Sequence, residues 1–197
     1  MYEENFIHTE FLSDVLICDK IIKTFNDNFD KAGPGRVGYH NELIVDTEIK
    51  ESYDLSINPK EVYTDKKYVD IKLYLDQLKQ IANNYIQKFP YSNEYSPWGI
   101  NDYINIQWYK PNGGFKKWHT ERNCATLPHA SRHLVWMTFL NDVDDGGETD
   151  FFHQRIKIPP KKGLTVLWPA DWTYTHKGLV SPTQDKYIIT GWYNFLN

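Results

Sequence analysis

The sequence predicts a mainly β protein with flanking helices, built as a β-sandwich or a double-sheet jelly roll. Two segments in the first 90 residues repeat apolar side chains at helical spacing. After Pro90 the chain changes to short segments rich in Ile, Tyr, Trp, Thr and Val, separated by turns that contain Pro and Gly. Many short strands with such turns favour two packed sheets, and the two helices are then expected to cover one outer face.

The first predicted helix covers residues 11–28. Ser13 is available as the N-cap and Asp14 lies in the first turn, and both favour a helix start. Apolar residues recur at helical spacing and indicate one buried face: Leu16, Ile17, Ile21, Ile22 and Phe25. The following stretch, to residue 59, opens with turn residues and then holds short β-prone pieces, so loops and one or two strands are expected there.

The second predicted helix is longer and covers residues 68–88. Its apolar positions are Ile71, Leu73, Leu75, Leu78, Ile81 and Tyr85. Strands are predicted in the remainder at 101–110, 116–121, 131–140, 148–158, 163–168 and 185–195. The turns between them are supplied by residues 111–114, 144–147 and 159–162.

Length and composition indicate one globular domain. The 197 residues are read as a single domain, with a helical support at about 11–90 and a jelly-roll core at about 98–197. A content of 41% hydrophobic and 16% aromatic residues is that of a chain with a packed core. The net charge of -4 argues against the basic surface of a nucleic-acid-binding protein, so no nucleic-acid partner is expected.

Cysteine content and hydropathy bear on the cellular compartment. Cys18 and Cys124 are too few for the disulfide framework of a small secreted protein. The first residues, MYEENFIHTEF, lack the basic and apolar regions of a signal peptide, and no run approaches the roughly 20 apolar residues of a membrane span. A cytoplasmic protein without a membrane partner is therefore expected, and the oligomeric state is left open.

His119 and Glu121 form the most informative short motif. Side chains two apart on an extended backbone point to the same face, so both can reach one metal ion. With His176 as a third ligand they would make the facial triad of non-heme Fe(II) enzymes, which leaves coordination positions open for small molecules. By itself the His-x-Glu pattern is common on surface strands, where it is usually a solvated pair.

Lys186 opens the last predicted strand and shares a face with Ile188, Thr190 and Trp192. A lysine on a face that is otherwise mostly apolar needs a counter-anion, because a buried ammonium without a partner is costly. A carboxylate at the far end of a bound cosubstrate would supply one. The alternative is that Lys186 sits at the strand start with its amine in water.

These residues, taken in order, resemble the iron- and 2-oxoglutarate-dependent dioxygenases, specifically the prolyl 4-hydroxylase-like branch. That family has a tyrosine about ten residues before the first metal histidine, a His-x-acid pair, a Gly-Gly-x-Thr-x-Phe hairpin, a distal histidine, and a basic residue about ten positions later. The matching positions here are Tyr109, His119, Glu121, the hairpin GGETDF at 146–151, His176 and Lys186. The segment FLSDVLICDKII also resembles the opening helix of the family.

The resemblance implies a double-stranded β-helix core, a jelly roll of the cupin-like kind, and a role for each matched residue. His119, Glu121 and His176 would bind iron, and Lys186 would pair with the distal carboxylate of 2-oxoglutarate. Tyr109 would hydrogen-bond the cosubstrate, and Thr190 and Trp192 would line the same pocket. Arg122 and Trp172 are weaker candidates for substrate contacts.

The departure from the family pattern is Glu121, because the family most often has aspartate there. The extra methylene moves the carboxylate outward and adds a rotamer, so either the metal sits further from the strand or the side chain folds back. From the sequence, a Glu121→Asp variant is expected to keep or improve iron affinity.

The function implied by the resemblance is an Fe(II)- and 2-oxoglutarate-dependent hydroxylase that consumes O2. Its expected products are a hydroxylated C–H position, succinate and CO2, with ascorbate as a further cofactor. A prolyl or other peptidyl residue is the first expected substrate, and a small molecule is the other. Two alternatives stay open: a cupin-like metal enzyme that does not use 2-oxoglutarate, and a non-catalytic jelly-roll binding protein with a vestigial metal site.

Overall fold

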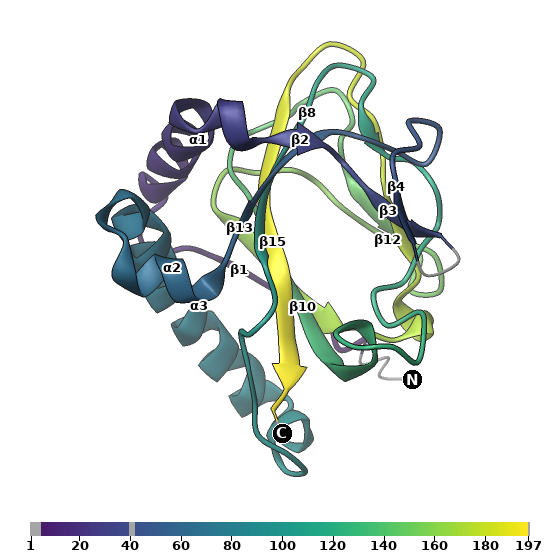
Figure 1. Ribbon diagram of the computed structural model, residues 1–197. Coiled ribbons are helices and arrows are strands. Elements are labelled where there is room, and N and C mark those ends of the chain that lie inside the picture. The colour runs from purple at the N-terminus through teal and green to yellow at the C-terminus, as the bar shows by residue number, and fades with distance from the viewer. Residues whose placement is uncertain (1–4, 40–41, 197) are drawn as a thin grey trace.

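The computed structural model describes residues 5–39 and 42–196, and two sheets that face each other form its centre. Helices lie against the outer face of the larger sheet (Figure 1). The long helices are α1 (Ile17–Asp27) and α3 (Val69–Lys88), with the shorter α2 (Pro59–Thr64) beside α3. Short 3-10 helices lie at Phe29–Lys31, Lys66–Tyr68, Pro90–Asn93, His129–Ser131 and Trp172–Tyr174.

The larger sheet has eight antiparallel strands, and seven of them lie in the order β1-β13-β10-β15-β8-β6-β2. Their bounds are β1 (His8–Phe11), β13 (Leu164–Pro169), β10 (Arg132–Phe139), β15 (Lys186–Phe195), β8 (Ile104–Tyr109), β6 (Tyr53–Ile57) and β2 (Gly33–Pro34). The eighth, β7 (Trp98–Gly99), pairs with the end of β15. Strands from the first half of the chain therefore extend the sheet at both edges.

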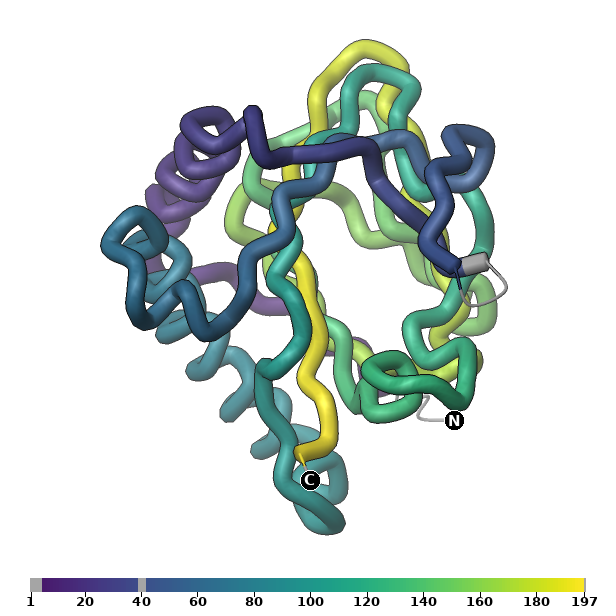
Figure 2. The backbone as a smooth tube through the Cα atoms, viewed as in Figure 1, coloured from purple at the N-terminus to yellow at the C-terminus, as the bar shows by residue number. Residues whose placement is uncertain are grey.

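The smaller sheet has the order β12-β11-β14, with bounds β12 (Ile156–Ile158), β11 (Thr149–Phe151) and β14 (His176–Gly178). Two strand pairs accompany it: β3 (Val37–Tyr39) with β4 (Glu42–Ile44), and β5 (Lys50–Glu51) with β9 (Gly114–Phe115). Figure 2 follows the chain from α1 across the top of the view to β3 and β4, on the side away from the helices. The predicted mainly β chain with flanking helices and a jelly-roll core is confirmed.

Alternation along the strands divides the core into two apolar clusters. In β10, Leu134 and Trp136 face the helices, whereas Val135 and Met137 face the smaller sheet. The helix-side cluster also takes the buried faces of α1 and α3. The cluster between the sheets adds Phe151 and other residues of the smaller sheet. The cluster between the sheets therefore packs against the polar residues that lie there.

Several predicted boundaries differ from the structure. The first helix runs from Ile17 to Asp27, since Phe11 ends an edge strand against β13 and residues 12–16 form a turn. Ser13 does not cap it: its hydroxyl donates to Gln77 Oε1, and the Asp14 carboxylate accepts the Leu16 N–H instead. The second helix is confirmed, since 68–88 was predicted and Val69–Lys88 is observed.

Two predicted strands are corrected. Residues 116–121 do not form a strand; their one ladder contact is an isolated bridge between His119 and His176. The predicted strand 148–158 is a hairpin, β11 and β12, because the chain turns between them, where Arg155 has φ 56°. The sequence also gave no indication of α2 or of the three-residue β14. Among the described helices, none combines the length and hydropathy that crossing a bilayer requires.

Candidate active site

The backbone around His119 is held against β14 from the smaller sheet. The His119 N–H donates to His176 O and the His176 N–H donates to His119 O, both at 2.9 Å. This reciprocal pair places the two residues directly opposite each other, and their ring centroids are 4.3 Å apart. Thr120 Oγ1 and the Arg122 N–H both donate to Ala170 O, so the segment is also fixed to the end of β13.

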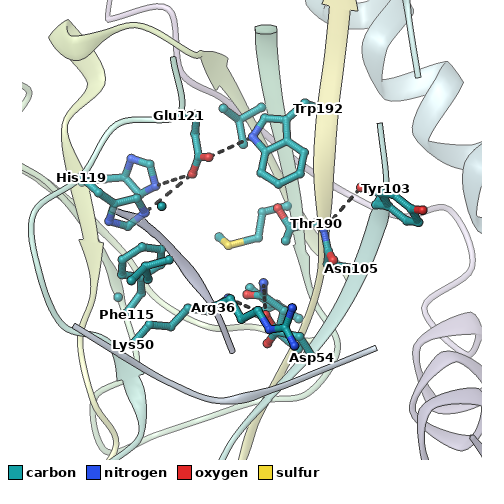
Figure 3. A pocket seen from close by; sticks show the side chains of 18 of the residues that line it. Arg36, Lys50, Asp54, Tyr103, Asn105, Phe115, His119, Glu121, Thr190 and Trp192 are labelled. Carbon is teal, nitrogen blue, oxygen red and sulfur yellow. Dashed lines mark hydrogen bonds and ion pairs between the residues drawn. The ribbon is translucent and has the colours of Figure 1, made fainter. Parts of the chain in front are cut away.

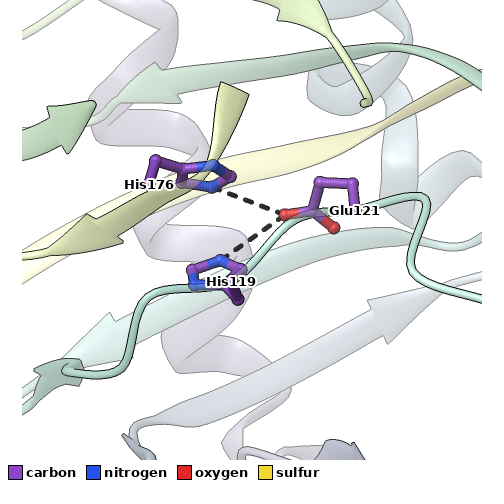
Figure 4. A group of neighbouring side chains, drawn as sticks. All are labelled: His119, Glu121 and His176. Carbon is purple, nitrogen blue, oxygen red and sulfur yellow. Dashed lines mark ion pairs between the residues drawn. The ribbon is translucent and has the colours of Figure 1, made fainter. Parts of the chain in front are cut away.

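The side chains of His119, Glu121 and His176 converge (Figure 4). Nε2 of each histidine lies 3.6 Å from Glu121 Oε1, and one ligand atom from each residue lies within 4.8 Å of the others. The two residues predicted from the His-x-Glu motif and the distal histidine are therefore brought together. A single bridge and an extended backbone achieve this, without the regular strand that was expected.

Backbone carbonyls select the tautomer of both histidines. Nδ1 of His119 lies 2.9 Å from Lys117 O, and Nδ1 of His176 lies 2.9 Å from Tyr174 O. A carbonyl oxygen can only accept, so each Nδ1 carries the proton and each Nε2 presents a lone pair toward Glu121. Metal-binding histidines are commonly oriented in this way by a partner on the second ring nitrogen.

The protonation states also suit a cation. Burial, together with the nearby His176, lowers the pKa of His119 to about 3, so its imidazole is neutral at pH 7. Burial alone would raise the pKa of Glu121, but the neighbouring His176 and His119 and the charge of Arg132 outweigh it and hold that pKa well below its usual range. A neutral imidazole and an ionised carboxylate are the forms that bind metals.

The cluster opens into a cavity of about 1060 Å³. Figure 3 shows His119 and Glu121 on one side of this cavity and Arg36, Lys50 and Asp54 across from them. The cavity lies between the two sheets and is lined by both apolar and charged side chains. A concave site of this volume that gathers a few polar groups is typical of a small-molecule or substrate site.

Lys186 lines the same cavity and is buried, with 4% of its surface exposed. Its ammonium donates to Gly147 O at 2.9 Å and Leu179 O at 3.2 Å. No carboxylate of residues 5–39 and 42–196 lies within ion-pair distance of it. Burial lowers the pKa of Lys186 to about 8. The alternative of an amine in bulk water is thus corrected: the amine is buried, and its two hydrogen-bond partners are neutral carbonyls.

Tyr109 is the strand partner of Lys186 across β8 and β15. The Lys186 ammonium lies 5.0 Å from the centre of the Tyr109 ring, and Tyr109 Oη donates to Gln107 Oε1 at 2.6 Å. Thr190 and Trp192 line the cavity, as predicted from their place on the same face of the strand as Lys186. Their polar atoms, however, have protein partners. Thr190 Oγ1 donates to Trp136 O, and Trp192 Nε1 donates to Glu121 Oε2.

Arg122 and Trp172 are not among the residues that line this cavity. Arg122 pairs with the Asp171 carboxylate, because its side chain leaves the backbone on the face opposite to that of Glu121. Trp172 is 66% exposed and packs edge-on against His153. The structure does not bring either residue to the cluster, so neither is carried forward as a substrate contact.

Two buried charged residues of the cavity, Arg132 and Lys50, were not predicted. Arg132 at the start of β10 has a side chain that is 8% exposed and contacts both Asp102 and Glu121. Lys50 is 5% exposed and pairs with Asp54 Oδ2 at 2.5 Å. Arg132 begins an otherwise apolar strand, and that signal, the same one that pointed to Lys186, could have identified it. Lys50 lies in a stretch without a clear period, so no comparable signal marks it.

The residues present fit the groups that an iron- and 2-oxoglutarate-dependent oxygenase requires. Two imidazole nitrogens and one carboxylate oxygen are the donor set of non-heme Fe(II) oxygenases. The buried Lys186 ammonium, without a carboxylate partner among the described residues, lines the same cavity and can receive a dicarboxylate.

Comparison with known proteins agrees with this chemistry. Residues 104–194 match the model of the 2OG-Fe(II) oxygenase superfamily. This range runs from β8 to β15 and includes the metal cluster and Lys186. No curated protein sequence matches the chain.

Solved structures share the fold at low sequence identity. A viral collagen prolyl hydroxylase from Paramecium bursaria Chlorella virus-1, solved with 2OG, has 16% identity and a TM-score of 0.69, and the match covers 98% of this chain and 97% of that one. A Pseudomonas putida prolyl-4-hydroxylase has 14% identity and a TM-score of 0.70, with 98% and 94% covered.

A third structure is a prolyl hydroxylase from Trichoplax adhaerens, in complex with a peptide fragment of the hypoxia inducible factor oxygen degradation domain. It has 15% identity and a TM-score of 0.73, with 97% of this chain and 84% of that chain covered. Together with the superfamily match, the shared fold agrees with the resemblance drawn from the ordered motif. Residues 104–194 are therefore similar to the 2OG-Fe(II) oxygenase superfamily, and the chain as a whole has the fold of prolyl 4-hydroxylases.

Proposed function

We propose that this oxygenase hydroxylates a C–H bond of a peptidyl residue, with proline as the first candidate. In this reaction one oxygen atom of O2 enters the C–H bond of the substrate and the other enters 2-oxoglutarate, which leaves as succinate and CO2. Iron supplies the dioxygen chemistry when bound, because protein side chains alone cannot. The observation that carries the proposal is that the His119, Glu121 and His176 cluster and the Lys186 ammonium line one cavity.

The residues of this chain then have separate tasks. His119, Glu121 and His176 hold the iron, and Lys186 binds the distal carboxylate of 2-oxoglutarate. Tyr109 packs beneath the Lys186 ammonium and limits the directions in which it can point. The apolar side chains between the sheets keep water away from these groups, which strengthens every charge interaction among them.

A peptide substrate is supported by the size of the cavity and by its opening. The cavity of about 1060 Å³ exceeds what a small cosubstrate fills, and exposed residues of β2 and the β3 strand contribute to its lining. The related fold from Trichoplax adhaerens was solved with a peptide fragment, which is in keeping with a peptide in this position.

The test is a reaction in which two products are measured together. Purified protein with Fe(II), ascorbate and 2-oxoglutarate is mixed with peptides that contain proline, and with matched peptides in which alanine replaces it. The proposal predicts succinate release that depends on the proline peptide, with a mass gain of one oxygen atom on that peptide. If a small molecule stimulates succinate release and none of the peptides does, the proposal of a peptidyl substrate is wrong. The similarity to the superfamily would be unaffected by that result.

A further inference from the structure

The two carboxylate oxygens of Glu121 have different surroundings. Oε1 faces His119 Nε2 and His176 Nε2, at 3.6 Å from each. Oε2 points the other way and accepts a hydrogen bond of 3.0 Å from Trp192 Nε1 (Figure 3). Arg132 Nη1 lies 3.4 Å from the same oxygen. One oxygen is therefore directed at the candidate metal position, and the other is held by the protein.

Arg132 is itself fixed in place by three further contacts. Its Nη2 donates to Asp102 Oδ2 at 3.2 Å, and its Nη1 donates to the backbone oxygen of Glu121 at 3.1 Å. The guanidinium lies over the Trp192 ring, 3.5 Å from the ring centre. Asp102, Arg132, Trp192 and Glu121 thus form one connected group, with an indole N–H and a guanidinium on the same carboxylate.

The positions of Trp192 and Arg132 are set by the larger sheet. Trp192 lies in β15 and Arg132 at the start of β10, and the two strands are neighbours in that sheet. Glu121 lies in the segment bridged to β14 of the smaller sheet. The Glu121 side chain therefore spans the space between the sheets, and its length decides whether both of its ends are satisfied.

We propose that Trp192 and Arg132 are positioning residues that hold the outer oxygen of Glu121 and make this metal site specific for glutamate. An aspartate at the same backbone position is shorter by one C–C bond, about 1.5 Å. Its carboxylate cannot both reach the histidines as Oε1 does and keep the contacts to Trp192 and Arg132. The glutamate that replaces the family's usual aspartate is then matched by two residues of this chain, Trp192 and Arg132. This inference rests on the proposed metal role of the cluster.

This reverses an expectation drawn from the sequence alone. Without the positions of Trp192 and Arg132, Glu121→Asp was expected to keep or improve iron affinity. With them, the variant leaves an indole N–H and a buried guanidinium without their shared acceptor. Loss of such an orienting partner typically weakens metal binding by about tenfold to a hundredfold. We therefore expect Glu121→Asp to bind metal about tenfold or more weakly than the wild type.

The test is a double-mutant cycle read by metal affinity. Co(II) is titrated into the full-length apoprotein and its visible absorption gives the dissociation constant for wild type, Glu121→Asp, Trp192→Phe and the double variant. Trp192→Phe keeps an aromatic ring beneath Arg132 and removes the N–H donor together with the rest of the five-membered ring. Each single variant is expected to raise the dissociation constant about tenfold or more. In the double variant the second change is expected to add little, because the aspartate has already lost the contact.

Trp98→Phe is the matched control. Trp98 Nε1 also donates a hydrogen bond, to Ser92 O at 3.1 Å, but it does not line the cavity. The Trp98→Phe substitution is therefore expected to leave the Co(II) dissociation constant unchanged. The unfolding free energy of each apoprotein is measured alongside, because a merely structural role of Trp192 would lower that quantity and leave the affinity of the folded protein unchanged.

Three results would overturn the inference while keeping the proposed function: wild-type affinity in Glu121→Asp, wild-type affinity in Trp192→Phe, or fully additive effects in the double variant. If Trp192→Phe does not fold, Glu121→Asp alone decides. If folded wild-type protein binds no Co(II) and no Fe(II), the proposed metal role of the cluster fails, and this inference fails with it.

Discussion

At Lys186 a buried charge lacks an ion-pair partner among the described residues. Its ammonium has two carbonyl partners, Gly147 O and Leu179 O, and no carboxylate within ion-pair distance among the described residues. Carbonyl oxygens satisfy N–H groups but bring no full negative charge, so the protonated form remains costly. This cost is the physical reason why its pKa falls to about 8, and a bound dicarboxylate would remove it.

The affinity for 2-oxoglutarate is therefore expected to depend on pH. Below pH 8 Lys186 is mostly an ammonium and can pair with the distal carboxylate; above its pKa of about 8 it is mostly a neutral amine. The dissociation constant for 2-oxoglutarate should be nearly constant below that pKa and rise as the pH increases beyond it. This dissociation constant is measured anaerobically on the Fe(II) protein, from one pH unit below the pKa of Lys186 to one unit above it.

Lys186→Arg is the control for this prediction, because a guanidinium stays charged throughout that range and the metal ligands are unchanged. The rise should disappear in the variant. A wild-type profile that is flat, or a rise that persists unchanged in Lys186→Arg, would contradict the role of Lys186.

At the residue scale, the members of the cluster were predicted because an ordered set of positions resembles the motif of a known family. His119 and Glu121 are two apart, and Tyr109 and Lys186 are marked by their distance from a histidine. The partners of these residues were not predictable. Arg132 reaches Glu121 only because β10 and β15 are neighbours in the sheet, and the tautomers of the histidines depend on backbone oxygens that folding places there.

β15 is the element on which the two halves of the core meet. Lys186, Thr190 and Trp192 point from it into the cavity, and Ile189 and Tyr193 point from it toward the helices. Gly191 lies between Thr190 and Trp192, opposite Trp136 of β10. A Cβ on Gly191 would lie 2.4 Å from Trp136 Cζ2, and Trp136 is fully buried. The absence of a side chain at Gly191 makes room for that indole.

Gly191→Ala is expected to lower the free energy of unfolding by about 1–3 kcal/mol, because Trp136 has no free space into which to move. The measurement is equilibrium unfolding in urea. Gly33→Ala in β2 is the matched control: a Cβ there meets nothing within 4 Å, so a change within about 0.5 kcal/mol is expected. Equal effects of the two substitutions would contradict this account of β15.

At the element scale, the sequence predicted best where the signal is local. The apolar period of residues 68–88 and the β-branched and aromatic content of β10, β13 and β15 do not depend on the rest of the chain. The prediction of a strand at residues 116–121 was wrong because a strand needs a partner along its length. Here the partner is the short β14, which pairs with this segment at His176 alone. A ladder between segments that far apart leaves no trace in local periodicity.

The molecule as a whole carries a net charge of -4, but the cavity lining has the opposite balance. Its three carboxylates have cationic partners: Asp54 pairs with Lys50, and Asp102 and Glu121 with Arg132. Lys31, Arg36 and Lys117 also line the cavity and are exposed. Positive charge at the mouth of a cavity raises the local concentration of anionic molecules.

Acidic peptides are therefore expected to be better substrates than matched neutral peptides. Their kcat/KM should fall as the ionic strength rises, because exposed charges are screened. Arg36→Glu combined with Lys117→Glu should reverse the preference, whereas Lys72→Glu, the same charge change on α3, should not. A preference for acidic peptides that is insensitive to both salt and the paired substitution would contradict the role of the mouth.

At the scale of the molecule, the fold class followed from the sequence and the assembly did not. Two helices and many short strands predict layers, yet nothing in residues 31–59 indicates that β6 pairs with β8 and β2 with β6 at the edge of the larger sheet. The pairings of β6 carry Asp54 to the cavity, and the pairing of β5 with β9 carries Lys50 there. The part of the site contributed by the first half of the chain was therefore hidden until the strands were placed.

The central claim is that His119, Glu121 and His176 hold iron in a cavity where Lys186 receives 2-oxoglutarate. The most direct test is the visible absorption of the anaerobic Fe(II) protein when 2-oxoglutarate is added. We predict a charge-transfer band that appears with 2-oxoglutarate, does not appear with succinate, which lacks the keto group, and is lost in His119→Ala. Folded wild-type protein that gives no such band at saturating Fe(II) and 2-oxoglutarate would contradict the account.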